Sequence, residues 1–156
     1  MVSEITWGGS GIEKVVFDFI CERVPIGSIV IELGAGYVST LALRDRYKLY
    51  SVDHNSEFVN LFQNVNYIYA PEVNGWYDMG IMYWRLPIPR EQQKLVLIDG
   101  LNRSSILQHL HLFNPDALFI VHDTNRSQES DLALELARRL KRPVTFYFEG
   151  DNWAAI

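Results

Sequence analysis

The sequence predicts an α/β fold in which a mostly parallel sheet carries helices on both faces. Strand and helix patterns alternate along the 156 residues, and two apolar strands end in carboxylates, at Glu32 and Asp53. Glu32 stands just before a Gly34-Ala35-Gly36 turn. Because parallel strands bring their carboxyl ends to one edge of a sheet, the sequence predicts a ligand site at that edge.

The helices are predicted from apolar residues that recur every three or four positions. Ile12, Val16 and Ile20 belong to the first such series, which ends near Pro25. Ser56 is the expected N-cap of a later helix. The predicted helices cover residues 12–24, 39–46, 56–63, 106–113 and 132–140, and Pro143 stops the last one.

The strands are predicted where short apolar runs are bounded by turn residues. The run before Asp99 and Gly100 has the branched composition of a central strand that is buried on both faces. A hairpin turn at Gly150 and Asp151 predicts that a mostly parallel seven-stranded sheet ends in an antiparallel pair. The predicted strands cover residues 29–33, 49–52, 66–69, 95–98, 117–121, 144–149 and 153–156.

The composition predicts one domain over residues 1–156, of which 48% are hydrophobic. The net charge of -5 argues against a nucleic-acid partner. A lone cysteine, Cys21, excludes an internal disulfide and fits a reducing compartment. No apolar run approaches the length of a membrane span. We therefore expect a soluble cytoplasmic protein whose partner is a small molecule.

Four sequence elements occur in an order that resembles the class I methyltransferases that use S-adenosylmethionine. The resemblance covers about residues 10–156 and is closest to the small O-methyltransferase-like subgroup. It implies a Rossmann-like fold with strand order 3-2-1-4-5-7-6. The four elements are Glu32-Leu33-Gly34-Ala35-Gly36 with Ser39-Thr40 after it, Ser51-Val52-Asp53-His54, Leu97-Ile98-Asp99-Gly100, and the terminal hairpin.

The resemblance implies cofactor contacts at the sheet edge. Gly34 and Gly36 would let the backbone approach the methionine part of the cofactor, and helix amides after the turn would take its carboxylate. Glu32 suits the α-ammonium, and Asp53 suits both ribose hydroxyls. The alternative is an ordinary strand-to-helix turn with helix-capping acids. The expected cofactor residues are Glu32, Gly34, Ala35, Gly36, Ser39, Thr40, Asp53, His54, Ala70, Glu72, Asp99 and Gly100.

A dinucleotide oxidoreductase is a rival that shares these parts. Its fingerprint requires a third small residue, glycine or alanine, three positions after the second glycine, to let helix and strand pack closely. Ser39 stands at that position here, so the sequence matches an NAD site poorly.

Two acids follow consecutive predicted strands and form the expected catalytic centre. Asp99 and Asp123 would face each other, and with Asn125 they offer the oxygen ligands that Mg²⁺ or Ca²⁺ prefers. Metal-dependent relatives usually carry a lysine or histidine base three residues beyond the first acid, where this chain has Asn102. The alternative is that Asp99 contacts only the cofactor and Asp123 caps a helix.

His122 completes the predicted catalytic set, with Asp99 and Asp123. Its place at the end of a strand makes it a candidate general base, and the alternative is a histidine that only satisfies hydrogen bonds there.

The aromatic segment over residues 71–90 is the expected acceptor pocket or lid, because it is the least regular part of the sequence. It contains Trp76, Tyr77, Tyr83 and Trp84. The alternatives are a cover for the open sheet edge and a homodimer contact. The N-terminal part, residues 1–25, is expected to hold a helix, and its residues 6–11 are a second candidate for acceptor binding.

These expectations together describe an S-adenosylmethionine-dependent methyltransferase. It is expected to transfer a methyl group to a hydroxyl of a small-molecule or glycan-type acceptor. The alternative is a binding or interaction module that holds S-adenosylmethionine without turnover.

Overall fold

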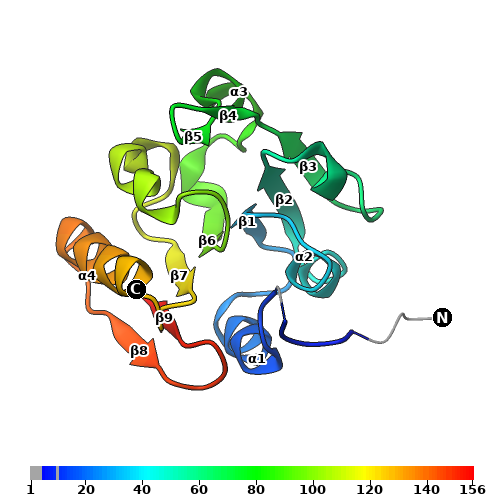
Figure 1. The fold of residues 1–156 in the computed structure, drawn as a ribbon. Coiled ribbons are helices and arrows are strands. Elements are labelled where there is room, and N and C mark those ends of the chain that lie inside the picture. Colours follow the sequence, from blue (N-terminus) through cyan, green and yellow to red (C-terminus); the bar gives the residue numbers. More distant parts are fainter. Residues whose placement is uncertain (1–4, 10) are drawn as a thin grey trace.

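The computed structural model describes residues 5–9 and 11–156 and contains a seven-stranded sheet (Figure 1). The strand order is β3-β2-β1-β6-β7-β9-β8, and a separate pair, β4-β5, lies outside this sheet. This confirms the Rossmann-like fold class. The strands are β1 (Ile29–Leu33), β2 (Lys48–Asp53), β3 (Asn66–Tyr69), β4 (Glu72–Val73), β5 (Trp76–Tyr77), β6 (Gln93–Ile98), β7 (Leu118–His122), β8 (Thr145–Tyr147) and β9 (Trp153–Ala155).

The terminal hairpin enters the sheet in the predicted way. Strand β9 runs antiparallel to β7, with Ile120 opposite Ala155 and His122 opposite Trp153. The pairs β1-β2, β1-β6, β2-β3 and β6-β7 are all parallel. Only β9 is therefore reversed, and the four parallel carboxyl ends of β1, β2, β6 and β7 lie along one edge of the sheet.

Apolar side chains fill both faces of the sheet, as expected for strands such as β1 that are buried along their whole length. One core packs helices α1 (Lys14–Arg23) and α2 (Ser39–Leu43) against one face. The other core packs α3 (Met79–Arg85) and α4 (Ser127–Leu140) against the opposite face. Figure 1 shows α1 and α2 on one side of the sheet and α4 on the other.

Two predicted helices are short 3-10 turns instead. Residues 56–63 form only the turn Ser56–Phe58, capped by Asn55, whose side chain accepts from Glu57 N at 3.0 Å. Left-handed backbone at Asn60 and Asn64 is incompatible with a continuous helix. Residues 106–113 fall into the turns Arg103–Gln108 and Leu110–Leu112. Apolar residues three apart share a face in both helix types, so their spacing could not distinguish them.

The aromatic segment over residues 71–90 is folded rather than irregular, and its role as an acceptor pocket or lid stays a prediction. It forms the β4-β5 hairpin and α3, followed by a 3-10 turn at Arg90–Gln92. Trp76 and Tyr77 are buried, whereas Tyr83 and Trp84 are exposed. Of these four aromatics, Tyr77 reaches the carboxyl edge of the sheet, where its hydroxyl accepts from Leu101 N at 3.2 Å.

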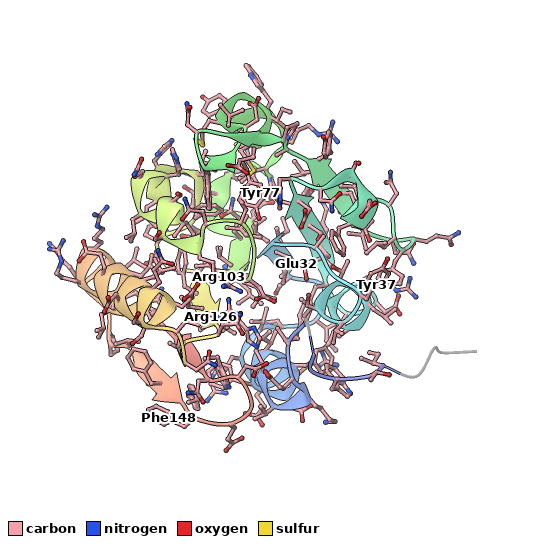
Figure 2. The ribbon with its side chains drawn as sticks, in the orientation of Figure 1. Glu32, Tyr37, Tyr77, Arg103, Arg126 and Phe148 are labelled. Atoms are coloured by element: carbon pink, nitrogen blue, oxygen red, sulfur yellow. The ribbon has the colours of Figure 1, made fainter. Side chains whose placement is uncertain are left out.

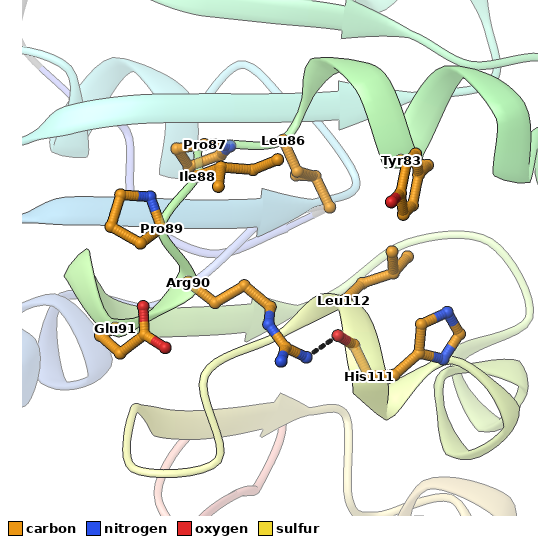
Figure 3. Close-up of a pocket in the computed structure, with 9 residues that line it drawn as sticks. All are labelled: Tyr83, Leu86, Pro87, Ile88, Pro89, Arg90, Glu91, His111 and Leu112. Carbon is orange, nitrogen blue, oxygen red and sulfur yellow. Dashed lines mark hydrogen bonds between the residues drawn. The ribbon is translucent and has the colours of Figure 1, made fainter.

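A cavity of about 430 Å³ lies beside α3 (Figure 3). Its walls include Tyr83, Leu86, Ile88 and Leu112, and Arg90 crosses it to donate to the carbonyl of His111. These residues precede β6 and β7 in the chain, so the cavity lies at the amino ends of these strands. It is separate from the edge that carries the acids.

No helix in the described part of the chain is both long and apolar enough to cross a membrane.

Candidate functional site

A cavity of about 240 Å³ opens at the carboxyl ends of β1, β2 and β6, and we call it the rim cavity. Eight of the expected cofactor residues line it. Glu32, Thr40, Ala70 and Glu72 do not. The lining residues are Gly34, Ala35, Gly36, Ser39, Asp53, His54, Asn55, Phe58, Asp99, Gly100 and Leu101.

Asp53 is the best-placed polar group of the rim cavity. Its Oδ2 accepts from Ala35 N at 3.0 Å and its Oδ1 accepts from Asn55 N at 2.8 Å. Burial raises the pKa of Asp53, and the backbone donors oppose this increase. Each carboxylate oxygen keeps further acceptor capacity, so the side chain is fixed in place and can still accept from a ligand.

The two glycines of the turn have different roles. Gly34 has φ +102°, and a Cβ there would lie 2.6 Å from Gly100 Cα, so its space is taken by the end of β6. A Cβ added at Gly36 would have Ser39 Oγ as its nearest neighbour, at 3.8 Å. Close packing of two strand ends therefore requires Gly34. The open space that was expected for a ligand lies at Gly36.

Glu32 lies behind the wall of the rim cavity, and its contact with the cofactor, directly or through water, stays a prediction. The side chain is fully buried, and its Oε2 accepts from Thr40 Oγ1 at 2.7 Å and from Ser51 Oγ at 2.5 Å. Thr40 Oγ1 in turn accepts from Gly36 N at 2.9 Å. The amide of Gly36 is thus already bonded within the turn.

Two of the expected cofactor residues, Ala70 and Glu72, do not line the rim cavity. Ala70 is buried and its N donates to Asp53 O at 3.0 Å, which closes the end of β3 onto β2. Glu72 is exposed and pairs with Tyr77 in the small hairpin.

Arg103 joins the predicted catalytic acids, and the sequence analysis missed it (Figure 2). Its Nη2 lies 2.7 Å from both Asp99 Oδ1 and Asp123 Oδ2, and its Nη1 lies 3.0 Å from Glu129 Oε1. Burial opposes the charge of Arg103, but Asp99, Asp123 and Glu129 outweigh it and raise the pKa of the guanidinium. The available signal was an arginine four residues after Asp99.

In this structure an arginine lies between the predicted metal ligands. Asp99 and Asp123 do come together, and with His122 they offer ligand atoms within 4.8 Å of one another. However, the guanidinium of Arg103 already bridges the two carboxylates. Arg103 supplies the positive charge that the metal was expected to supply, and Asn125 lines the same cavity as the two acids.

His122 is held between acids on both sides. Its Nδ1 lies 3.2 Å from Asp99 Oδ1, and its Nε2 lies 3.0 Å from Glu13 Oε2. Burial disfavours the imidazolium, but Asp99, Glu13 and Asp123 outweigh it and raise the pKa of His122 to about 9. With this pKa, His122 carries a proton at neutral pH and suits a proton donor, and its role as a general base stays a prediction.

A second cavity, of about 420 Å³, adjoins the rim cavity at Asp99, and we call it the polar cavity. Figure 2 places Arg103 and Arg126 near each other beside α4, and both bind Asp123 Oδ2. The polar cavity is lined by Gly9, Asp99, Arg103, His122, Asp123, Asn125, Arg126 and Asp151. Acids and bases that lie at or after the ends of β6 and β7, and an acid of the terminal hairpin, thus meet around one space.

No protein-family model and no curated protein matches the sequence. Among solved structures, the fold is similar to the X-ray structure of precorrin 8W decarboxylase from Methanobacterium thermoautotrophicum, with a TM-score of 0.63. The two chains are 15% identical, and the similarity covers 97% of this chain and 94% of that chain. At this identity the likeness establishes a shared fold.

The comparisons correct the methyltransferase assignment. The protein with the similar fold is named as a decarboxylase, and no family model supports the class I methyltransferases or their small O-methyltransferase-like subgroup. The prediction of O-methyl transfer to a small-molecule or glycan-type hydroxyl is therefore wrong, because the motif order it rested on describes the fold and not the reaction. The bound cofactor and the roles of individual site residues stay predictions.

Proposed function

We propose that this chain is an enzyme that binds a ribonucleoside cofactor in the rim cavity, with S-adenosylmethionine as the cofactor that the sequence predicts. The observation that carries this proposal is the carboxylate of Asp53, which two backbone amides hold at the cavity wall. A carboxylate has two acceptor oxygens, and the diol of a ribose offers two donors. The number of acceptors therefore equals the number of donors.

Two further features of the rim cavity support a nucleoside. Phe58 lines it, and Tyr37 packs edge-on against Phe58 with ring centroids 5.9 Å apart. Tyr37 is exposed and, in Figure 2, points outward next to α2. An aromatic pair at a cavity mouth offers apolar surface to a planar base. The opening above Gly36 leaves room for the rest of the ligand.

Replacement of Asp53 by alanine is expected to weaken S-adenosylmethionine binding by about 1.5 to 3 kcal/mol, because hydrogen bonds to a charged acceptor are lost. Isothermal titration calorimetry measures this directly. Asp45→Ala is the matched control, since the side chain of Asp45 is 65% exposed and lies outside the rim cavity. Unchanged affinity in Asp53→Ala, or tighter binding of NAD than of S-adenosylmethionine, would contradict the proposal.

A second candidate function is decarboxylation of a small carboxylate substrate in the polar cavity. The observation that favours it is that a protonated His122 and the exposed guanidinium of Arg126 both line the polar cavity. When a carboxylate leaves as carbon dioxide, the bonding electron pair stays on the substrate carbon and must receive a proton. His122 can donate that proton, and Arg126 can hold a carboxylate of the substrate.

Release of carbon dioxide from precorrin 8W, the substrate named for the similar structure, tests this candidate. His122→Gln is expected to lower the rate by about 10²- to 10⁴-fold, the usual contribution of a general acid. His111→Gln is the control, because His111 lies by the cavity at the opposite edge of the sheet. In deuterated water the product carbon should gain one deuterium. Release no faster than the uncatalysed rate would reject this substrate.

A small-molecule partner and a cytoplasmic location follow from the same proposal. Both cavities at the carboxyl edge are lined by polar groups, and the lone Cys21 has no disulfide partner. Nucleotide cofactors are available in the reducing interior of the cell.

A further inference from the structure

Glu32 is a fully buried acid whose two carboxylate oxygens are in different environments. Oε2 accepts hydrogen bonds from Thr40 and Ser51. Oε1 is buried and has no hydrogen-bond partner among the described residues. A buried polar atom without a partner carries a free-energy cost, so its persistence at a ligand site calls for an explanation.

In its environment Glu32 lies close to the balance between its protonated and its ionised form. Burial raises the pKa of Glu32 to about 7, against the opposing effect of the Ser39, Ser51 and Thr40 hydroxyls. The carboxylate of Asp99, at the end of β6, raises it further. The charge of Glu32 in turn helps to raise the pKa of the Tyr67 hydroxyl on β3. A positive charge brought nearby would shift this balance toward the ionised form.

Glu32 is connected to the rim cavity through hydroxyl groups. Thr40 links the carboxylate of Glu32 to the amide of Gly36. The Ser39 hydroxyl, which lowers the pKa of Glu32, belongs to a residue that lines the cavity itself. The acid is therefore one side chain behind the cavity wall. In this low-dielectric position it can sense a charge inside the cavity without touching the ligand.

We propose that Glu32 makes the rim cavity selective for positively charged ligands, by ionising and releasing its proton when the ligand's cationic group enters. The inference rests on the proposed nucleoside function and names the charge of the ligand that the cavity prefers. Glu32 acts through Thr40 and Ser39, so it is a positioning residue. A cationic nucleoside such as S-adenosylmethionine gains from the ionised acid, whereas neutral adenosine does not.

Proton release is measured by calorimetry of S-adenosylmethionine binding at pH 7 in buffers of different ionisation enthalpy. The wild-type protein should release about half a proton more than Glu32→Gln, because the acid is about half protonated there. Asp53 and the ligand's own amine titrate in both proteins, so the difference belongs to Glu32. Adenosine should show no such difference.

Affinity provides a second readout. Between pH 6 and pH 8 the wild-type affinity for S-adenosylmethionine should rise about tenfold relative to Glu32→Gln, following the ionised fraction of the acid. If S-adenosylmethionine binds but both proteins release the same number of protons, the inference about Glu32 is overturned and the proposed function stands. If neither S-adenosylmethionine nor adenosine binds, the proposed function fails, and the inference fails with it.

The ligand-free protein provides an independent check of the buried acid. A carboxyl whose pKa is higher in the folded than in the unfolded chain stabilises the fold below the unfolded pKa and loses that effect as pH rises through the folded pKa. Relative to Glu32→Gln, the wild-type folding equilibrium constant should fall by about two orders of magnitude from pH 4.5 to pH 7. A constant ratio would overturn the inference. If Glu32→Gln does not fold, the protons that the wild type releases on binding S-adenosylmethionine rather than adenosine decide the question.

Discussion

Replacing Arg103 by methionine should destabilise the fold by about 3 to 5 kcal/mol, the usual cost of removing one partner from a buried ion pair. The side chain of Arg103 is 10% exposed, and the side chains of its three acidic partners are 10 to 14% exposed. These acids come from the ends of β6 and β7 and from the first turn of α4. Methionine keeps the length of the side chain but leaves Asp99, Asp123 and Glu129 with uncompensated charge.

Urea unfolding followed by circular dichroism at pH 7 measures this loss. Arg126→Met is the matched control, because the side chain of Arg126 is 61% exposed and makes a single contact, 3.3 Å from Asp123 Oδ2. An exposed pair of this kind contributes at most about 1 kcal/mol. Equal stabilities of the two variants would show that Arg103 does not hold the carboxyl ends of β6 and β7 together.

Replacing Gly34 by alanine should cost about 3 kcal/mol or more, because two penalties combine. The φ of +102° is strained for any residue with a Cβ, which costs about 1 to 3 kcal/mol. The new Cβ would also lie 2.6 Å from Gly100 Cα and 2.8 Å from Asp99 C, both of them backbone atoms. Backbone shifts of that kind add about 1 to 3 kcal/mol.

Gly36→Ala separates packing from ligand binding. No atom lies closer than 3.8 Å to a Cβ at Gly36, so this variant should stay within about 1 kcal/mol of the wild type. Its methyl group would project where a ligand is expected, and S-adenosylmethionine binding should weaken. Thermal unfolding scans without the ligand measure the stability of the variant, and scans with the ligand measure its binding. A Gly34→Ala protein as stable as Gly36→Ala would contradict the strand-packing role of Gly34.

The strands were predicted well because their signals are local. Strand β1 begins and ends at the predicted residues, since an apolar run interrupted only by Glu32 lies between Ser28 and Gly34. The terminal hairpin and its antiparallel pairing are also confirmed, because Gly150 adopts positive φ at the turn. A turn residue and an apolar run were sufficient in each case.

The helical segments were predicted less well because the spacing of apolar residues does not reveal the conformation of the backbone. Residues 56–63 have the right composition, yet Asn60 and Asn64 adopt left-handed conformations. Asparagine tolerates such conformations better than most residues, and nothing in a periodicity argument accounts for that.

The carboxylates of the site were found, but their partners were not. Asp53, Asp99 and Asp123 stand at the predicted sheet edge, because each one follows a parallel strand. Arg103 and Glu13 reach these groups from a 3-10 turn and from the residue before α1. Glu13 lies 109 residues from His122, which leaves no spacing to read, whereas Arg103 lies only four residues after Asp99. A metal was predicted because two facing acids need a cation, and that cation is an arginine.

The single junction between β1 and β6 has a consequence for how the protein folds. Strands β1, β2 and β3 come from the first half of the chain and the other four sheet strands from the second, and the halves join where Val30 pairs with Leu95. Closing a loop of about 65 residues is entropically expensive, so this junction should form late. The rim cavity has walls from both halves, so it does not exist until the junction closes. A ligand that binds only when the junction is closed would stabilise the closed state by its binding free energy. It would therefore also slow the separation of the two halves.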